Sequence, residues 1–217
     1  DVTGPDHDAE PGQIWNAAND NGSGTASVME IAAAFSALRE KPRRSIVFAA
    51  FFGEEKGMLG SRIYASHPAF PLAKTVAMIN MEQLGRTDSP EGDQTRRAGI
   101  TGFDYSDLGD LFKKAGEYAG VTIYEDAYFS DRYFPASDNI SLANLGVPAH
   151  TYAVAAQFPD YHREGDDWQK IDFNNMALAV KTAATATLIL TQSERTPQWN
   201  AANPKATRYL EAWRKLQ

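Results

Sequence analysis

The stretch SIVFAAFFGEEKG, residues 45–57, decides the fold class, because an apolar run leads directly into two adjacent carboxylates. Residues 45–52 have the composition of a buried strand covered on both faces. Glu54 and Glu55 then stand where that strand should end. A second apolar run, residues 75–81, leads in the same way into Glu82. Carboxylates near a core are costly to desolvate, so their repeated placement at strand ends indicates a function rather than a gain in stability.

Helical and strand patterns alternate along the rest of the chain. Helices are predicted over residues 25–38, 57–66, 106–119, 139–145, 173–190 and 203–216, strands over 98–102, 121–124 and 148–152, and a polar loop over 86–97. This alternation predicts a three-layer α/β/α sandwich. In such folds ligands bind beyond the carboxyl ends of the strands, where the acidic residues fall. We find no internal repeat or linker and expect one domain over residues 1–217.

Charge and composition limit the partners and metal ligands that can be expected for this chain. The chain has 21 basic and 28 acidic residues, a net charge of -7 and no basic block. Nucleic acid is therefore not an expected partner, whereas a neutral or cationic substrate is acceptable. There are no cysteines, so a metal would have to be held by His, Asp and Glu. No apolar run reaches the roughly 18 residues that span a bilayer, and we expect a soluble protein.

Two further polar segments complete a candidate metal-ligand set. Asp20 lies in NDNGSG, residues 19–24, and His162 lies in DYHREGDD, residues 160–167. With Glu54, Glu55 and Glu82 they offer three or four oxygen ligands and one imidazole. Such a set suits zinc in an open catalytic site better than in a closed structural one.

Each of these residues also has an ordinary structural interpretation. Asp20 could be a turn residue, and Glu54 with Glu55 could begin a solvated helix. Glu82 could be an exposed charge paired with Arg86, and His162 could be a loop histidine. The case for a metal site therefore rests on the joint order of the residues.

Other conspicuous residues are assigned to packing or to loops. His67 stands beside Pro68, which is typical of a loop. His150 lies within a predicted strand, which favours a core or rim histidine over a ligand. The aromatic residues Phe129, Tyr133 and Phe134 are interpreted as core or loop packing.

The joint order of these motifs resembles the zinc-dependent aminopeptidases and their relatives, the glutaminyl cyclases. The resemblance covers roughly residues 13–190. It implies a mixed, mostly parallel sheet between helix layers, as in other zinc exopeptidases. It is carried by residues 16–26, 43–48, 53–61, 79–86, 137–139, 145–149 and 161–167.

The resemblance also implies a ligand set. Asp20 would bridge two zinc ions, Glu55 and His162 would complete one site, and Glu82 would bind the second ion. Glu82 stands where the family more often has aspartate.

The same resemblance implies roles in catalysis. Glu54 would be the general base, and its neighbour Glu55 could reach the metal if the chain turns sharply between them. The phenol of Tyr161 would hydrogen-bond the developing oxyanion. Asp138 would orient the substrate or a ligand, and Asn139 replaces a common histidine beside it.

One ligand of the family is missing from the printed residues. That ligand is a histidine in a His-x-Asp motif at the end of an earlier strand. Asp1 could be the aspartate of this motif, and His7 is a poor substitute for the histidine. We therefore expect an N-terminal strand to be lacking, with two zinc ions bound if the upstream histidine is present and one otherwise.

Three functions follow as hypotheses. The first is an aminopeptidase acting on a peptide or small amino-acyl substrate, which by family analogy would be extracellular or periplasmic. The second is a single-zinc glutaminyl cyclase that uses Asp20, Glu55 and His162. Its pocket would need aromatic walls, yet Trp168 is not directly before His162, where Tyr161 stands. The third is a metal-free binding domain.

Overall fold

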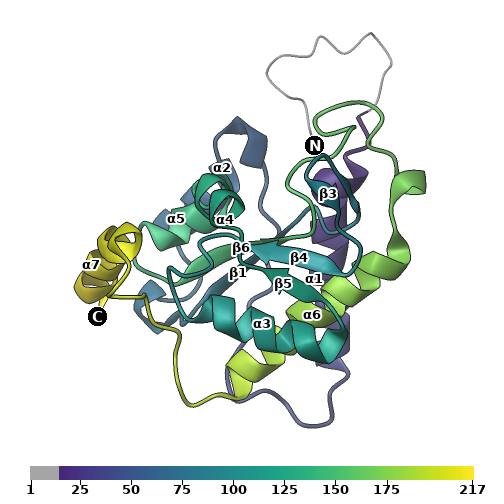
Figure 1. Ribbon diagram of the computed structural model, residues 1–217. Helices are drawn as coiled ribbons and strands as arrows, with labels where there is room; N and C mark the ends of the chain where they lie inside the picture. The colour runs from purple at the N-terminus through teal and green to yellow at the C-terminus, as the bar shows by residue number, and fades with distance from the viewer. Residues whose placement is uncertain (1–14) are drawn as a thin grey trace.

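A mixed sheet lies between two layers of helices in the computed structural model, which describes residues 15–217 apart from the side chains of residues 127 and 128 (Figure 1). Asp1 and His7 lie outside the described residues. The sheet order is β1-β6-β4-β5, where β1 is Met78–Glu82, β6 Ala149–Ala153, β4 Arg97–Ile100 and β5 Thr122–Tyr124. The pairs β1–β6 and β4–β5 are parallel, and β4–β6 is antiparallel.

The helices bury different faces of this sheet. One face is covered by α1 (Gly24–Ser36), α3 (Leu108–Ala119) and α6 (Phe173–Gln192). The other face carries α2 (Leu59–Ser66), α5 (Asn139–Ala143) and α7 (Thr207–Leu216). The helix α4 (Ala127–Tyr133) lies near α5 (Figure 1). The predicted three-layer α/β/α sandwich with a mostly parallel sheet is confirmed.

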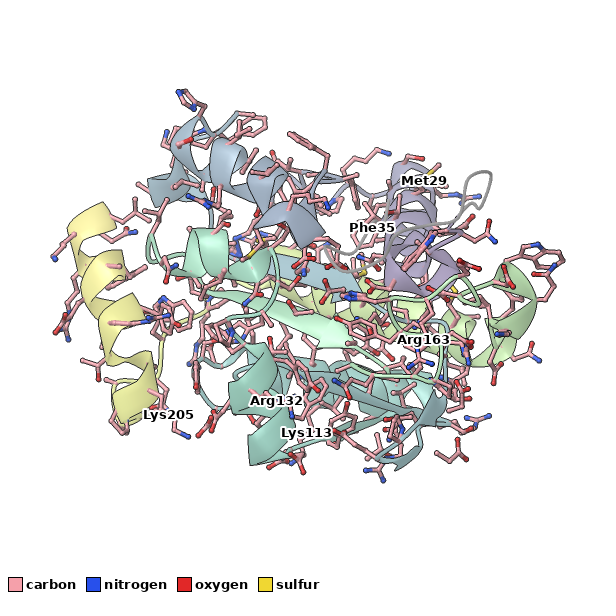
Figure 2. The ribbon with its side chains drawn as sticks, turned by 90° about the horizontal axis from the view of Figure 1, so that it is seen from above. Met29, Phe35, Lys113, Arg132, Arg163 and Lys205 are labelled. Carbon is pink, nitrogen blue, oxygen red and sulfur yellow. The ribbon has the colours of Figure 1, made fainter. Side chains whose placement is uncertain are left out.

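Burial of one side of each helix positions these layers. On α1, Phe35 is buried while Met29 is exposed (Figure 2). The first core joins α1, α3 and α6 to the sheet through residues such as Ile100 and Tyr152. The second core packs α7 through Tyr209 at the end of the molecule away from α1 (Figures 1 and 2). Packing against the helices therefore holds the sheet in place. The carboxyl ends of its strands, where the acidic residues lie, are held in place with it.

The prediction that residues 45–52 form a strand is wrong. These residues are extended, but the structure assigns them no strand and, within the described chain, no ladder partner. Val47 is 49% exposed and Phe52 64% exposed, so the segment is not covered on both faces. A strand needs a neighbour for its backbone groups, and here a groove separates residues 45–52 from β1.

The other predicted elements are present, with ends shifted by a few residues. The loop at residues 86–97 contains a short hairpin, β2 (Asp88–Ser89) and β3 (Gly92–Asp93). Helix α4 was not predicted, because its seven residues are too few to establish a helical period. Short 3-10 turns at Glu54–Lys56, Leu72–Lys74, Trp168–Lys170 and Pro204–Ala206, and a π-helical turn at Ala18–Ser23, complete the described elements.

Candidate metal centre

Asp20, Glu55 and His162 come together although they are far apart in the sequence. The Nε2 atom of His162 lies 2.7 Å from Glu55 Oε1 and 3.2 Å from Asp20 Oδ2. One ligand atom from each residue lies within 4.8 Å of the other two. Asp20 is buried and the other two side chains are partly exposed. Three of the four predicted metal ligands thus share one site.

The loop that carries Asp20 is held against the end of β1. The side-chain amide of Asn21 donates to the Met81 carbonyl at 3.0 Å, and its oxygen accepts the Gly24 N–H at 3.0 Å. A Cβ at position 24 would lie 2.3 Å from the Met81 carbonyl oxygen. Glycine at this position therefore allows the start of α1 to approach β1 closely, and this approach places Asp20 beside Glu82.

A tight turn presents Glu54 and Glu55 to the site. The two residues begin a 3-10 turn that lies between Gly53 (φ 66°) and Gly57 (φ 91°). Both glycines occupy the left-handed region, which other residues rarely adopt. The chain thus turns sharply at these adjacent glutamates, which is the condition that their two implied roles require, and the turn leaves Glu55 against His162 with Glu54 beside it.

A buried carboxylate that sequence reasoning did not select holds the Asp20 loop. Asp166 accepts the backbone N–H of Asn19 at 3.0 Å and that of Asp20 at 2.9 Å. Its own carbonyl accepts the Ala18 N–H. The side chain is only 2% exposed. Its place four residues after His162, within a run of acidic residues, was the available signal.

The segment before His162 is anchored by charge. Asp160 accepts from Arg86 and Lys170, each at 2.9 Å. Arg86 also pairs with Asp88. The alternative pairing of Arg86 with Glu82 is therefore wrong, which leaves Glu82 without that cation.

Crowded carboxylates dominate the electrostatics. Burial, followed by the charges of Glu55, Asp138 and Asp20, raises the pKa of Glu54 to about 8. Burial and the Asp20 charge raise the pKa of Glu55. Burial and Glu54 raise the pKa of Glu82 well above its usual range. Such a cluster disfavours its own ionisation, and a divalent cation would relieve the repulsion.

Two buried polar atoms indicate that Asp20, Glu55 and His162 could hold a zinc ion. Asp20 Oδ2 and His162 Nε2 are both buried, and neither makes a hydrogen bond of acceptable geometry within the described residues. Buried polar atoms are normally satisfied, so two such atoms facing each other indicate a shared ligand. Two carboxylates and an imidazole, with further positions open, match a catalytic zinc site.

The remaining predicted site residues lie around this centre. Glu82 lines the same small cavity, of about 50 Å³, as Asp20, Glu54, Glu55 and Tyr161. Its Oε1 accepts from the Ser137 hydroxyl at 2.7 Å, so it lies beside the cluster of three rather than within it.

Tyr161 lines the small cavity at the site, and Asp138 lines the neighbouring groove. The Tyr161 ring stacks on His162 with a centroid distance of 3.8 Å, and burial raises the pKa of its phenol. Asp138 is buried and accepts from the Ser61 hydroxyl. Burial also raises the pKa of Asp138, whose charge acts on Glu54.

The residues assigned to packing lie away from the metal ligands or support the walls of the site. His150 is 1% exposed and contacts the Ser106 hydroxyl and the Thr101 carbonyl, each at 2.7 Å, which confirms a core histidine. Phe129 and Phe134 are buried, and Phe129 and Tyr133 also line the small cavity at the site, so the assignment of these two residues to packing alone is incomplete. Asn139 is also buried, and its side chain donates to the Phe134 carbonyl and accepts from Thr151 rather than meeting the metal ligands.

Fold and site together define an α/β protein in which two carboxylates and an imidazole converge in an arrangement that could hold a metal ion. The pattern of peptidase family M28 matches residues 3–187, and the chain belongs to this family. A protein of Pyrenophora tritici-repentis described as "Probable zinc metalloprotease" is 37% identical over 73 residues, which is 34% of this chain and 16% of that protein.

Solved structures share the fold. The LapA aminopeptidase of Legionella pneumophila superposes with a TM-score of 0.71 and 22% identity, over 82% of this chain and 48% of that one. A glutaminyl cyclase of Porphyromonas gingivalis superposes with a TM-score of 0.57 and 16% identity, over 80% and 63%. This chain thus spans only part of each relative. Among the described residues, no helix combines the length and apolar character that a bilayer crossing requires.

Proposed function

We propose that the complete protein is a zinc-dependent aminopeptidase that hydrolyses the peptide bond next to a free amino terminus. The observation that supports this most directly is the meeting of Asp20, Glu55 and His162 within 4.8 Å, with Glu54 adjacent. These three residues would hold the zinc ion, and Glu82 would contribute to a second ion if an upstream histidine completes that site. Bound zinc would polarise the scissile carbonyl and make water a stronger nucleophile at neutral pH.

Glu54 is the proposed general base. It takes a proton from water as the water oxygen bonds to the carbonyl carbon, and it returns that proton to the leaving amine as the C–N bond breaks. The pKa of about 8 in the metal-free site would keep Glu54 largely protonated at neutral pH. A nearby dication lowers the pKa of a carboxyl group, so the base would become competent when the site is loaded.

Tyr161 and Asp138 are proposed to act on the substrate. The Tyr161 phenol would donate a hydrogen bond to the oxyanion, and its raised pKa keeps the proton available for this. One well-placed donor of this type is worth about 3–4 kcal/mol in the transition state. Asp138 would hold the substrate amino group or orient Glu54 from the other side of the site.

A glutaminyl cyclase is the second candidate, because one zinc at the same three residues would suffice and a cyclase shares the fold. Aromatic walls around a glutamine side chain would be needed. Trp168 is 64% exposed and does not supply one, whereas Phe129, Tyr133 and Tyr161 line the small cavity beside the ligands. The third hypothesis, a metal-free binding domain, does not account for the convergence of Asp20, Glu55 and His162, whose ligand atoms lie within 4.8 Å of one another. A location outside the cytoplasm remains a proposal from family analogy.

Product analysis separates the candidates. The complete protein is supplied with zinc, its bound zinc is measured, and it is then incubated with leucine amide and with a peptide that begins with glutamine. We expect free leucine from the first and free glutamine from the second. Pyroglutamyl peptide released with ammonia would instead establish the cyclase. No product from either substrate, with no zinc bound at equilibrium, would establish a binding domain.

A further inference from the structure

Arg86 is a buried cation that the proposed chemistry does not use. Its side chain is only 4% exposed, which is unusual for an arginine. Its Nε and Nη2 atoms donate to the two oxygens of Asp88 at 2.7 Å and 2.5 Å, and Nη1 donates to Asp160 at 2.9 Å. Removing such a charge from water is costly, and buried ion pairs often fail to repay that cost in stability. A role other than stability is therefore worth seeking for this residue.

The bond from Nη1 reaches the His162 loop, residues 158–166. The second carboxylate oxygen of Asp160 accepts from Lys170 at 2.9 Å. The backbone carbonyl of Asp160 accepts the Arg163 N–H at 3.0 Å, which closes a turn with His162 inside it. Within this turn His162 has a φ of 54°. Residues other than glycine keep this left-handed conformation only where their surroundings enforce it, and the bonds to Asp160 supply such enforcement.

The guanidinium also contacts the His162 loop through aromatic rings. Its Cζ atom lies 5.1 Å from the ring centroid of Phe158, which is a cation–π contact. The buried ring of Phe158 meets the ring of Tyr161 edge to face at 5.7 Å. The Tyr161 ring then stacks on His162 at 3.8 Å. Arg86 is thus one end of a column of side chains whose other end is a candidate metal ligand.

The backbone beside Arg86 binds the loop that carries the opposite ligand. The Gly85 N–H donates to the side-chain oxygen of Asn19 at 2.7 Å, and Asn19 directly precedes Asp20. A Cβ at position 85 would lie 3.1 Å from that oxygen and 2.6 Å from the Ile171 side chain, so glycine permits the close approach. One short segment therefore holds the Asp20 loop by its backbone and the His162 loop by the side chain of Arg86.

The arrangement around Arg86 requires an arginine. A guanidinium is planar, presents its donors in a fixed fork and stacks on aromatic faces. Asp88 takes the paired bonds, Asp160 takes the third donor and Phe158 takes the face. A lysine ammonium would carry the same charge without the fork, so it would not hold these three groups in one fixed geometry.

We propose that Arg86 is a positioning residue that fixes the His162 loop relative to the Asp20 loop. It acts through Asp160 and through the Phe158–Tyr161 stack, and it touches none of the three candidate ligands. Its hold on the loop does not depend on the proposed chemistry. Its effect on turnover rests on the proposed function, because that effect passes through Tyr161 and the zinc ligands.

Hydrogen exchange of the metal-free complete protein tests the hold on the loop. The variant is Arg86→Lys, which keeps the charge and removes the fork. Amides of residues 158–166 should exchange at least tenfold faster in this variant, whereas amides of α3 should be unchanged. The control is Lys113→Met, which removes an exposed cation paired with Glu125 and should leave the loop at the parent rate. Equal loop exchange in Arg86→Lys and the parent would overturn the proposal.

Zinc affinity and steady-state kinetics separate positioning from a purely structural role. Supporting groups around metal sites contribute about 10- to 100-fold, so Arg86→Lys should weaken zinc binding by at least about tenfold. At saturating zinc, kcat on leucine amide per bound zinc should fall while KM stays close to the parent value, because the Tyr161 hydrogen bond is made in the transition state. A loop that exchanges faster with unchanged zinc affinity and kcat would overturn the positioning role.

A double-mutant cycle identifies the route. Asp160→Asn should reproduce the loss in zinc affinity seen in Arg86→Lys, and the double variant should lose little more than either single variant, because all three weaken the same bond. Asp88→Asn should have a smaller effect, since that carboxylate is bonded to Arg86 but not to the His162 loop. Fully additive losses for Arg86→Lys and Asp160→Asn would contradict action through Asp160.

Failure of this proposal differs from failure of the aminopeptidase proposal. A parent protein that binds zinc, loses affinity in Arg86→Lys and releases no leucine would contradict the peptidase and support the positioning role. An active parent whose loop exchange, zinc affinity and kcat are all unchanged in Arg86→Lys would support the peptidase and overturn the positioning role.

Discussion

The carboxylate of Asp166 accepts the backbone N–H of Asp20 at 2.9 Å, so the loop that follows His162 fixes the loop that carries the opposite metal ligand. The bond joins residues 146 positions apart in the sequence. Asp166 itself does not belong to the cluster of three ligand residues. Its contribution is to hold the backbone of one ligand at a set distance from another, as supporting groups around metal sites commonly do.

Replacing Asp166 should weaken zinc binding without removing a ligand. We expect Asp166→Ala to lower zinc affinity about 10- to 100-fold, and Asp166→Asn to have a smaller effect because its oxygen can still accept one N–H. Competition with a chromophoric chelator measures the dissociation constant. The matched control is Asp167→Ala, which removes a neighbouring carboxylate whose bond to Asn16 is exposed. Equal affinities for Asp166→Ala and Asp167→Ala would refute the positioning role.

Glu54→Gln should retain zinc and lose turnover. The amide keeps the shape of the side chain but cannot accept the proton, so kcat on leucine amide should fall about 10²- to 10⁴-fold. Zinc content measured on the same sample should stay at the parent value. Glu40→Gln, at an exposed position, serves as the control. A variant nearly as active as the parent would show that Glu54 is not the base.

Gly24→Ala should destabilise the protein even though alanine favours helices by about 1 kcal/mol over glycine. The added Cβ would lie 2.3 Å from the Met81 carbonyl oxygen, which forces α1 away from β1. We expect a loss of about 1–3 kcal/mol in the free energy of unfolding. Urea denaturation measures it, with exposed Glu30→Ala on the same helix as control. An unchanged or higher stability would mean that the close approach is not required.

His150 should make the fold sensitive to acid. Burial lowers the pKa of His150 to about 4. Between about pH 6.5 and pH 4, the imidazole of His150 is therefore protonated in the unfolded chain but neutral in the folded chain. The free energy of unfolding falls as the pH falls through this window. The contribution is about 3 kcal/mol across the window, from about 1.4 kcal/mol per pKa unit.

The comparison for His150 is the variant His150→Asn, whose amide can still donate to the Thr101 carbonyl. The unfolding free energies of parent and variant, measured from pH 7 to pH 4, should converge as the pH falls. Parallel curves would show that His150 is not the group responsible.

The helices and central strands could be predicted from sequence because their apolar periods are set by local burial. Residues 173–190 and 148–152 are examples, and both are helix or strand in the structure as predicted. Residues 45–52 could not be assigned correctly by the same rule. Their composition is that of a buried strand, but pairing depends on a neighbour that no local pattern specifies.

The residues of the candidate site differ in how well they could be predicted from the sequence. Glu54 and Glu55 could be selected because they follow an apolar run, and the structure places them in a tight turn between Gly53 and Gly57. Residue types placed Asp20 and His162 in one candidate ligand set, and the assignment of both to the same ion came from the family resemblance, since the two residues are joined by tertiary contacts alone. Asp166 was missed because its role is to accept backbone N–H groups, and such a role leaves no pattern in side-chain spacing.

Crystallography of the zinc-loaded protein, with anomalous data collected on both sides of the zinc absorption edge, tests the central claim most directly. We predict an edge-specific anomalous peak about 2.0–2.2 Å from a carboxylate oxygen of Asp20, an oxygen of Glu55 and Nε2 of His162. An ordered protein whose zinc peaks all lie elsewhere, with these three side chains too far apart to share an ion, would contradict the account.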